Sequence, residues 1–350
     1  MKNIKLKVLS KIFDYPSKHP SELDIKTAVV FVPRQLGDVM SVFPVIRAFQ
    51  KAAIDNIVVV GKLYSKAVLL PLEKEGIALF FVAHERKYLS IVKVAREIRK
   101  KYKEVDLCVQ TMQRDMTATL LFQGVLKAKS NLGAHVSELN LHCNECCVNA
   151  ANMRGSHYPP PIVWSALMKD AGIAEVEGKY ELVIPNDAVD DIAPDYGDYV
   201  LVNMDGSCQA RCLNVEVAEK ITDIAWDVFG KKIIITCAPC GEAKAQILSN
   251  SRAFVFLPDI SRSIINAACL VKKASLVISP DTAIVHIASA FDRPVLGIYC
   301  ELKNGWQPLS EISSVIETGQ NINHLDLGQL RDNLLQLKEK MDLAAVKYTS

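Results

Sequence analysis

The stretch Thr27-Ala28-Val29-Val30-Phe31-Val32-Pro33-Arg34-Gln35-Leu36-Gly37-Asp38-Val39-Met40 decides the fold. After Thr27, the next six residues are apolar and rich in Val, which predicts a buried strand. A short polar loop follows and leads into an amphipathic helical pattern that continues through Pro44 to Arg47. A strand that runs through a loop into a helix is the repeating unit of a parallel sheet with crossover helices.

The same alternation continues after this stretch. We expect strands at 27–33, 56–61, 78–83 and 106–111, and helices at 42–53, 88–101 and 115–126. A less regular region, 129–161, follows and ends in Pro159-Pro160-Pro161, whose missing amide donors forbid a continuous helix or a central strand. We expect a further helix at 162–171.

A second series of strands and helices begins near Tyr199. Strands are predicted at 199–205, 232–237, 254–257, 276–279 and 295–299, with helices that start near residues 215, 242, 261 and 282. This pattern indicates a five-stranded doubly wound domain. In the tail, Leu327, Leu330, Leu334, Leu337 and Met341 follow at three- and four-residue steps, which predicts an apolar stripe on a helix.

These patterns divide the chain into five parts. We expect a basic amphipathic leader at 1–24, an N-terminal Rossmann-like domain at 25–170, an acidic connector at 171–198, a C-terminal Rossmann-like domain at 199–322 and a C-terminal helix at 323–350 that packs across both domains. Open α/β sheets bind ligands at the carboxyl ends of their strands. Function is therefore expected in the strand-to-helix loops, with the two domains facing a central cleft.

Composition excludes several classes of protein. The 350 residues carry 41 Lys and Arg against 39 Asp and Glu, and a net charge of +2 makes no general case for nucleic-acid binding. Charges, prolines or polar turns interrupt every apolar run before the roughly 20 residues needed to cross a bilayer. Lysines also interrupt the first 24 residues, so no secretory core forms there, and we expect a cytoplasmic protein. The leader is either solvated or a weak interfacial helix that contacts anionic lipid.

Asp38 is the first candidate for chemistry. It can cap the following helix by accepting backbone N–H bonds, or it can act as a general base at the mouth of a cleft, where the helix dipole would keep it ionised. Gly37 permits close backbone approach, and Arg34 belongs to the same loop. The loop contains one glycine and therefore lacks the three-glycine fingerprint of dinucleotide binding.

The second candidate is the loop Ser279-Pro280-Asp281-Thr282-Ala283-Ile284-Val285-His286-Ile287-Ala288. A strand here runs straight into a helix capped by Asp281 or Thr282, and the first amides of that helix make an anion site that suits a diphosphate. His286 lies one turn further along. A lone histidine on a helix is more often structural than catalytic, but its place near a strand end favours a role in the site.

The two loops together resemble the ADP-heptose lipopolysaccharide heptosyltransferases, which are glycosyltransferases of family nine. Leu36-Gly37-Asp38-Val39 followed by Phe43-Pro44-Val45-Ile46-Arg47-Ala48 is similar to the amino-terminal motif of that family. The segment 281–288, followed by Arg293-Pro294-Val295-Leu296-Gly297-Ile298-Tyr299, is similar to its Asp-Thr-Gly-x-x-His-x-Ala element and the strand after it. The resemblance spans residues 27–306 and implies a GT-B fold, in which the domain 25–170 binds the acceptor and the domain 199–322 binds the nucleotide-sugar.

The resemblance also implies roles for the residues of the predicted donor site. It places Asp281, Thr282, Ala283 and His286 at the donor, Arg211 on the donor phosphates and Glu242 on the nucleotide ribose, although a first-turn helix acid explains Glu242 equally well. Two positions depart from the family pattern. Leu213-Asn214 stands where the family has Trp-Pro, and Ala283 replaces a glycine, so its methyl group crowds the approach of the phosphates.

Ten cysteines are expected as free thiols in a reducing compartment. The pairs Cys143-x-x-Cys146, Cys208-x3-Cys212 and Cys237-x-x-Cys240 have spacings that could supply metal ligands. We favour thiols without a metal, because Cys237 and Cys240 flank the junction of a strand and a helix, where small residues pack. The alternative is an ion held by Cys143, Cys146 and Cys147, which lie in a loop.

We therefore expect an inverting glycosyltransferase that uses no metal and no other cofactor. The resemblance implies transfer of heptose from ADP-heptose to a lipopolysaccharide inner-core or lipid A-linked sugar, with Asp38 as base, in bacterial envelope biosynthesis. We expect no nucleic-acid partner and a location in the cytoplasm, with peripheral contact at the inner membrane. Alternatives are a protein-modifying heptosyltransferase, a relative that uses another nucleotide-sugar, a non-catalytic nucleotide-sugar-binding protein, and a metal-dependent module around Cys143–Cys147.

Overall fold

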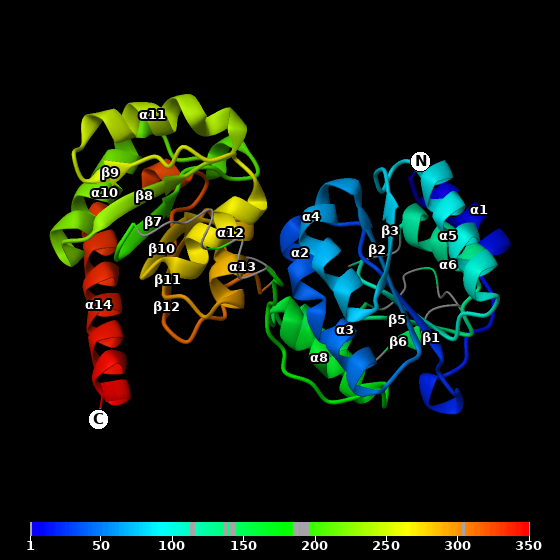
Figure 1. The fold of residues 1–350 in the computed structure, drawn as a ribbon. Coiled ribbons are helices and arrows are strands. Elements are labelled where there is room, and N and C mark those ends of the chain that lie inside the picture. Colours follow the sequence, from blue (N-terminus) through cyan, green and yellow to red (C-terminus); the bar gives the residue numbers. More distant parts are fainter. Residues whose placement is uncertain are drawn as a thin grey trace. The chain divides into compact units, whose positions relative to one another are not determined.

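The computed structural model describes residues 2–112, 116–135, 139, 145–146, 148–184, 189, 196–302 and 305–349. The chain forms two compact units, Met1–Tyr180 and Glu181–Ser350, and each is described by itself. Each unit contains a parallel sheet with helices packed against it (Figure 1). None of the described helices combines the length and the apolar character needed to cross a bilayer.

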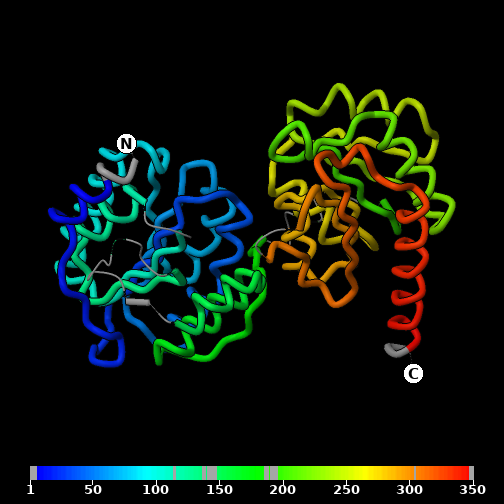
Figure 2. The backbone as a smooth tube through the Cα atoms, turned by 180° about the vertical axis from the view of Figure 1, so that it is seen from behind, coloured from blue at the N-terminus to red at the C-terminus, as the bar shows by residue number. Residues whose placement is uncertain are grey.

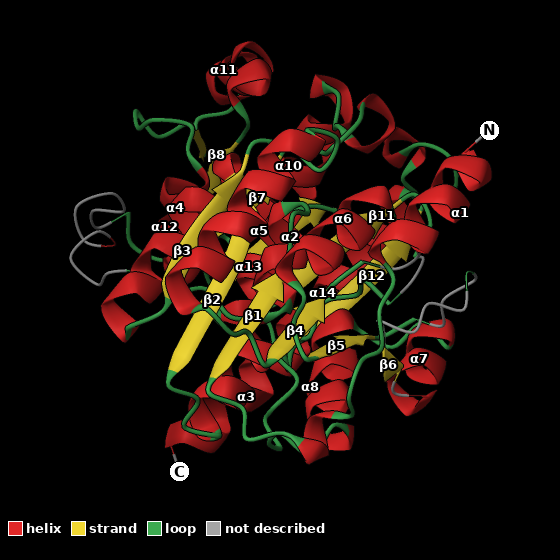
Figure 3. Ribbon diagram, turned by 90° about the vertical axis from the view of Figure 1, so that its right-hand side faces the viewer, coloured by secondary structure: helices red, strands yellow, loops and turns green. Residues whose placement is uncertain are grey.

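Unit 1 is built on six parallel strands among the described residues, in the order β3-β2-β1-β4-β5-β6, most of which can be followed in Figure 3. The strands are β1 (Thr27–Phe31), β2 (Asn56–Lys62), β3 (Ala78–Val82), β4 (Leu107–Gln110), β5 (Ser130–Gly133) and β6 (Glu145–Cys146). The helices are α1 (Lys2–Phe13), α2 (Leu36–Ser41), α3 (Phe43–Lys51), α4 (Lys66–Leu69), α5 (Tyr88–Tyr102), α6 (Thr117–Leu126), α7 (Val148–Gly155) and α8 (Pro160–Asp170). β1 is buried along its whole length, as the run of Val and Phe predicts.

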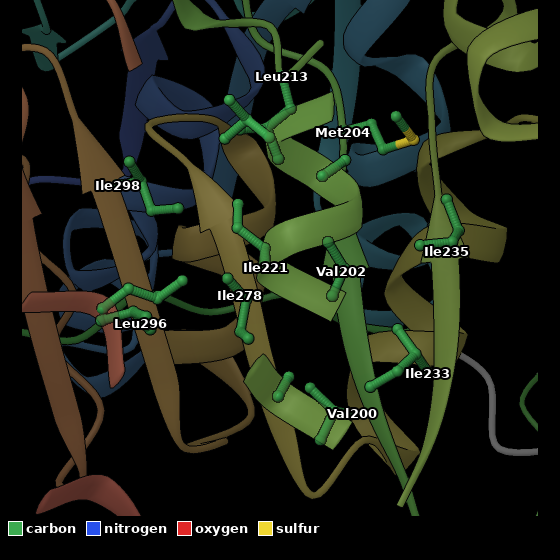
Figure 4. Close-up of a cluster of buried hydrophobic side chains, with 14 of the residues drawn as sticks. Val200, Val202, Met204, Leu213, Ile221, Ile233, Ile235, Ile278, Leu296 and Ile298 are labelled. Carbon is green, nitrogen blue, oxygen red and sulfur yellow. The ribbon is translucent and has the colours of Figure 1, made fainter. Parts of the chain in front are cut away.

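Unit 2 repeats this architecture, with the strand order β12-β11-β10-β7-β8-β9. The strands are β7 (Tyr199–Asn203), β8 (Lys232–Thr236), β9 (Val255–Phe256), β10 (Leu276–Pro280), β11 (Val295–Tyr299) and β12 (Ser313–Glu317). The helices are α10 (Val215–Phe229), α11 (Glu242–Ser251), α12 (Ile264–Lys273), α13 (Ala283–Ala290) and α14 (Leu327–Thr349). Figure 4 shows how Val202, Ile235 and Ile278 from neighbouring strands meet Ile221 of α10 in the core.

Strand order locates the ligand-binding edge of each unit. In unit 1 the first strand lies between the second and the fourth, and in unit 2 β7 likewise lies between β8 and β10. The crossovers therefore reverse direction between β1 and β4 and between β7 and β10. In sheets of this order, ligands bind outside the carboxyl ends of the strands at that point. The loops after β1, β7 and β10 carry Asp38, Arg211 and Thr282.

The predicted α/β fold with two doubly wound parallel sheets is confirmed, but several details of the prediction were wrong. The region 129–161, expected to be less regular, adds β5 and β6 to the four predicted strands of unit 1. Unit 2 has a sixth strand, β12, which follows a polar connection and lies at the edge of the sheet. The predicted helix 42–53 is present as α3, but the stretch before it, expected to be a loop, forms the short helix α2; the two helices meet at Val42, because Pro44 in the first turn of α3 has no N–H to continue α2. Pro160 and Pro161 do not interrupt regular structure: they begin α8, where an N–H would have no partner.

The ends of the chain are helical. α1 packs against α6 in unit 1, and α14 packs against α10 and β12 in unit 2, where Figure 2 traces it as the last segment. Leu330, Leu334 and Leu337 of the predicted apolar stripe are buried in the core of unit 2. Packing of this helix across both domains stays a prediction. The boundary between the units lies after Tyr180, within the predicted connector, and Asp187, Asp190, Asp191 and Asp195 of that connector lie outside the described residues.

Candidate active site

Asp38 lies in the first turn of α2, directly after the carboxyl end of β1. The backbone N–H of Gln35 donates to its Oδ2 at 3.2 Å, so the carboxylate does cap the helix. Its Oδ1 accepts from Nε of Arg34 at 3.3 Å, and the side chain of Asp38 is 13% exposed. The cap uses part of the hydrogen-bonding capacity of the carboxylate and leaves room for a further donor. The structural and the catalytic interpretations are therefore compatible.

Burial dominates the electrostatics of Asp38. The loss of solvation raises the pKa of this carboxyl above its ordinary value, and it outweighs the lowering effects of Arg34, the Gln35 amide and Arg154. We expected the helix dipole to set the charge state; desolvation is the larger effect. A carboxylate with a raised pKa is a stronger base than one in water, which suits proton abstraction from a hydroxyl.

The surroundings of Asp38 include two residues that the sequence did not single out. The hydroxyl of Tyr64 donates to the carbonyl of Arg34 at 2.5 Å and lies 2.7 Å from Oε1 of Gln35, which fixes the loop. Arg154 of α7 interacts electrostatically with Asp38, and burial lowers the pKa of its guanidinium to about 10. Arg154 lies in the irregular region before α8, where no motif indicates its place.

The guanidinium of Arg154 lies over an aromatic ring. Its guanidinium carbon lies 5.1 Å from the centroid of Trp164, and its Nη1 is buried and makes no hydrogen bond to the described residues. A buried guanidinium N–H without an acceptor is costly, and an anionic ligand would satisfy it. Gly37 is half-buried in the first turn of α2 without a positive φ, and the close backbone approach expected there stays a prediction.

The second group of predicted residues meets at the carboxyl ends of β7 and β10 in unit 2. Nη1 of Arg211 and Oδ2 of Asp281 lie 2.8 Å apart, with Arg211 38% and Asp281 15% exposed. Burial raises the pKa of Asp281, and Arg211 opposes this shift. Thr282 is the N-cap of α13 and accepts from the N–H of Ile284 at 3.2 Å. A cation and a helix N-terminus therefore lie together, as a diphosphate requires.

Asn203 connects this group to the neighbouring strand. Its Nδ2 donates to Oγ of Ser279 at 3.1 Å, to Oγ1 of Thr282 at 3.2 Å and to the carbonyl of Asp205 at 2.9 Å. A buried amide that links two adjacent strands fixes both loops at one edge of the sheet. Sequence reasoning passed over Asn203, although its position at the end of β7 was a signal of a site.

Glu242 begins α11 and forms an ion pair with Arg262, at 3.0 Å between Oε1 and Nη2. Beside it, Asp205 accepts from the N–H of Ala238 at 2.8 Å and lies so close to Gly241 that a Cβ there would be 1.9 Å from Oδ2. The ion pair of Glu242 and the hydrogen bond of Asp205 both hold the start of α11 in place. Contact of Glu242 with a ribose stays a prediction.

The remaining predicted residues of this group lie along α13. Ala283 is its first residue and is partly exposed, so its methyl group lies at the N-terminus of the helix. His286 is 4% exposed, its ring centroid lies 5.3 Å from that of Trp306, and burial lowers its pKa to about 3. The imidazole is therefore neutral and part of the interior, and a role in donor binding stays a prediction.

The cysteine motifs yield no assembled ligand set in the part of the chain that the structure describes, where no three His, Cys, Asp or Glu side chains lie close enough to hold an ion. Cys208, Cys212, Cys237 and Cys240 are free thiols. Cys143, Cys147 and the side chain of Cys146 lie outside the described residues, so the predicted alternative site is untested.

Comparison with known proteins places this fold and these loops in a family. Residues 230–326 match the family model of glycosyltransferase family 9 (heptosyltransferase), a range that includes Glu242 and the whole loop 279–288. The Escherichia coli K12 protein YeeL, described as uncharacterized, is 30% identical over 218 residues, which are 60% of this chain and 92% of YeeL.

Solved structures show the same fold over nearly the whole chain. A family 9 glycosyltransferase of Veillonella parvula is 14% identical with a TM-score of 0.72, and it matches over 89% of this chain and 97% of its own. E. coli heptosyltransferase WaaC, solved with ADP, is 16% identical with a TM-score of 0.68, over 89% and 100%. E. coli ADP-heptose lipopolysaccharide heptosyltransferase II is 14% identical with a TM-score of 0.66, over 89% and 99%. The chain has the GT-B fold and belongs to glycosyltransferase family 9, the heptosyltransferases, and is a glycosyltransferase.

Proposed function

We propose that this chain transfers a heptose from ADP-heptose to an inner-core sugar of lipopolysaccharide, with Asp38 as the general base. The observation that carries the proposal is the state of Asp38: a nearly buried carboxylate with a raised pKa, at the carboxyl edge of its sheet and beside two guanidinium groups. A carboxylate in that place can receive the proton of a sugar hydroxyl. The membership of family 9 supports the class of sugar.

The reaction is a single displacement. As the acceptor oxygen attacks the anomeric carbon of the donor, its proton passes to Asp38. The new oxygen–carbon bond forms while the bond from that carbon to the diphosphate oxygen breaks, and ADP leaves with the bonding electron pair. Attack and departure take place on opposite faces of the carbon, so the anomeric configuration inverts. General base catalysis of this kind contributes roughly 10²–10⁴-fold.

The donor is assigned to unit 2. Arg211 carries the charge that balances the departing diphosphate, and the N-terminus of α13 with the Thr282 hydroxyl supplies hydrogen bonds. Asp281 holds the guanidinium in place until the donor binds. A guanidinium binds phosphate in a bidentate manner, so this proposal requires no metal ion. Glu242 and His286 remain candidates at the nucleotide end.

The acceptor is assigned to unit 1. Arg154 has a buried N–H that bonds to none of the described residues, and Arg34 lies next to Asp38, so the charge at this edge suits a sugar acceptor that carries an anionic group. An acidic or phosphorylated sugar on a lipid anchor has that chemistry. We therefore place the reaction at the cytoplasmic face of the membrane that holds the acceptor, with the enzyme as a peripheral protein.

Calorimetric titration tests the donor assignment. ADP-heptose should bind, and UDP-glucose and GDP-mannose should bind at least tenfold more weakly. Mass analysis of the products should then show addition of heptose to an inner-core acceptor and not to a peptide. Tighter binding of another nucleotide-sugar, transfer to protein, or binding of ADP-heptose without turnover with any inner-core acceptor would contradict the proposal.

A further inference from the structure

Positive charge is concentrated in two segments of unit 1. Residues 1–13 and 88–103 hold 10 of the 41 Lys and Arg residues of the chain but one of its 39 Asp and Glu residues, Glu97. The rest of the chain therefore has an excess of acid, 38 against 31. Glu97 pairs with Lys93 at 3.9 Å, so it does not neutralise the basic residues near the end of α5. The small net charge of the protein conceals this asymmetry.

The end of α5 forms one wall of a surface cavity of about 480 Å³. Arg96, Arg99, Lys100 and Lys103 line it, with Gly124 and Val125 at the end of α6. All four basic residues are exposed. Cations in the last turn of a helix are favoured by its dipole, which explains Arg99 and Lys100 on structural grounds. The helix dipole does not explain Arg96, which lies one turn earlier, and it does not explain why four basic side chains line one cavity.

α1 extends this basic surface. Phe13 packs on Gly124, where a Cβ would lie 2.5 Å from the Cβ of Phe13, so the glycine allows α1 to approach α6. Figures 1 and 3 show α1, α5 and α6 grouped on the same side of unit 1. On α1, Val8 and Ile12 are one turn apart and 54% and 66% exposed. Exposed lysines, at positions 7 and 11, precede each of them.

This surface is separate from the reacting atoms. α5 connects the carboxyl end of β3 to the amino end of β4, and α6 ends before β5, so the cavity lies at the amino edge of the sheet. Asp38 follows β1 at the opposite edge. A ligand in the cavity is therefore neither the donor nor the hydroxyl that is glycosylated.

We propose that α1 together with the cavity between the ends of α5 and α6 docks unit 1 on an anionic phospholipid bilayer. Exposed apolar residues flanked by lysines are the pattern of a helix that lies in the membrane interface, and a cluster of Lys and Arg attracts anionic headgroups. Lipid phosphates occupy the cavity, and Val8 and Ile12 enter the boundary of the acyl region. The inference rests on the proposed function only in the choice of a membrane as partner.

The test is co-sedimentation of the full chain with vesicles, without donor or acceptor. Vesicles of phosphatidylcholine with phosphatidylglycerol should bind the protein, and vesicles of phosphatidylcholine alone should bind it far less. The double variant Arg99→Gln/Lys100→Gln should bind about 30-fold more weakly, because each cation near an anionic surface contributes about 1 kcal/mol. A control, Lys66→Gln/Lys74→Gln, removes the same charge elsewhere in unit 1 and should bind like the wild type.

A second variant tests the apolar part of the surface. Val8→Ser/Ile12→Ser leaves the charge unchanged and should weaken binding to the anionic vesicles. The ratio of wild-type to variant binding should be the same with and without added inorganic phosphate. Circular dichroism checks that each variant is folded. Equal binding by wild type and Arg99→Gln/Lys100→Gln, or binding of inorganic phosphate without binding to vesicles, would overturn the proposal. Because no sugar is present, these outcomes do not depend on whether the proposed transfer reaction is correct.

Discussion

Replacement of Asp38 by asparagine separates its two roles. Asparagine keeps an oxygen that can accept the N–H of Gln35, so the cap of α2 survives. It cannot accept a proton from the acceptor, so the variant loses the general base. From the usual contribution of such a base we expect kcat to fall by roughly 10²–10⁴-fold, which is about 3–5 kcal/mol in the barrier.

Donor affinity should not change in this variant. Asp38 belongs to unit 1, whereas Arg211, Asp281 and Thr282 belong to unit 2. Calorimetry with ADP-heptose should therefore give the same Kd for Asp38→Asn and the wild type. Release of ADP in the presence of acceptor measures the loss of turnover. A variant that keeps more than a tenth of wild-type kcat would refute the assignment of Asp38 as base.

The pH dependence provides an independent measurement. Asp38 must be ionised to accept a proton, so kcat/KM falls as the pH drops through its pKa. Because burial raises that pKa, the fall should begin at a higher pH than for a carboxyl in water. The wild-type profile should show this acidic limb, and the residual activity of Asp38→Asn should not. An acidic limb that is identical in the two proteins would show that another group titrates.

Three further predictions concern other parts of the molecule. Asp106→Asn is a matched control, because Asp106 is also a buried carboxylate of unit 1 that accepts backbone N–H groups but lies at the amino edge. In this variant kcat should be kept, and stability should fall by about 1–3 kcal/mol in denaturant titration. Its pKa is lowered by Lys129 and two amides, so this stability is present at neutral pH and is lost as the pH falls below the usual Asp range. Arg211→Gln should weaken binding of ADP-heptose by roughly 10- to 100-fold in calorimetry, and unchanged affinity would remove it from the donor site. Gly241→Ala should lower the free energy of unfolding of unit 2 by about 1–3 kcal/mol, and with it the melting temperature, because the new methyl group displaces Asp205 from the Ala238 amide. An unchanged melting curve would contradict this contact.

The sequence was sufficient for the fold because the central strands of both sheets are buried on both faces. Continuous runs such as 28–32, which consists of Ala, Val and Phe alone, give a strong signal. β12 was not predicted, because this edge strand is partly exposed and its sequence mixes apolar and polar residues. β6 has two residues and carries no periodic signal.

Some residues of the candidate site could be predicted from the sequence, and others could not. Asp38 and Thr282 follow strand ends in short loops, so their neighbours are local in sequence and the pattern could indicate them. Arg154 approaches Asp38 from a helix more than a hundred residues away, and Asn203 joins two strands that are adjacent only in the folded sheet. No local pattern carries such contacts. The neutral state of His286 follows from its burial, which the sequence did not indicate.

The most direct test of the proposed reaction is the product itself. The purified chain is incubated with ADP-heptose and a lipid-linked inner-core acceptor, and the product is analysed by mass spectrometry and NMR. We expect the acceptor to gain one heptosyl group, with the anomeric configuration opposite to that of the donor. An acceptor that stays unmodified, or a product that retains the configuration of the donor, would contradict a single displacement assisted by Asp38.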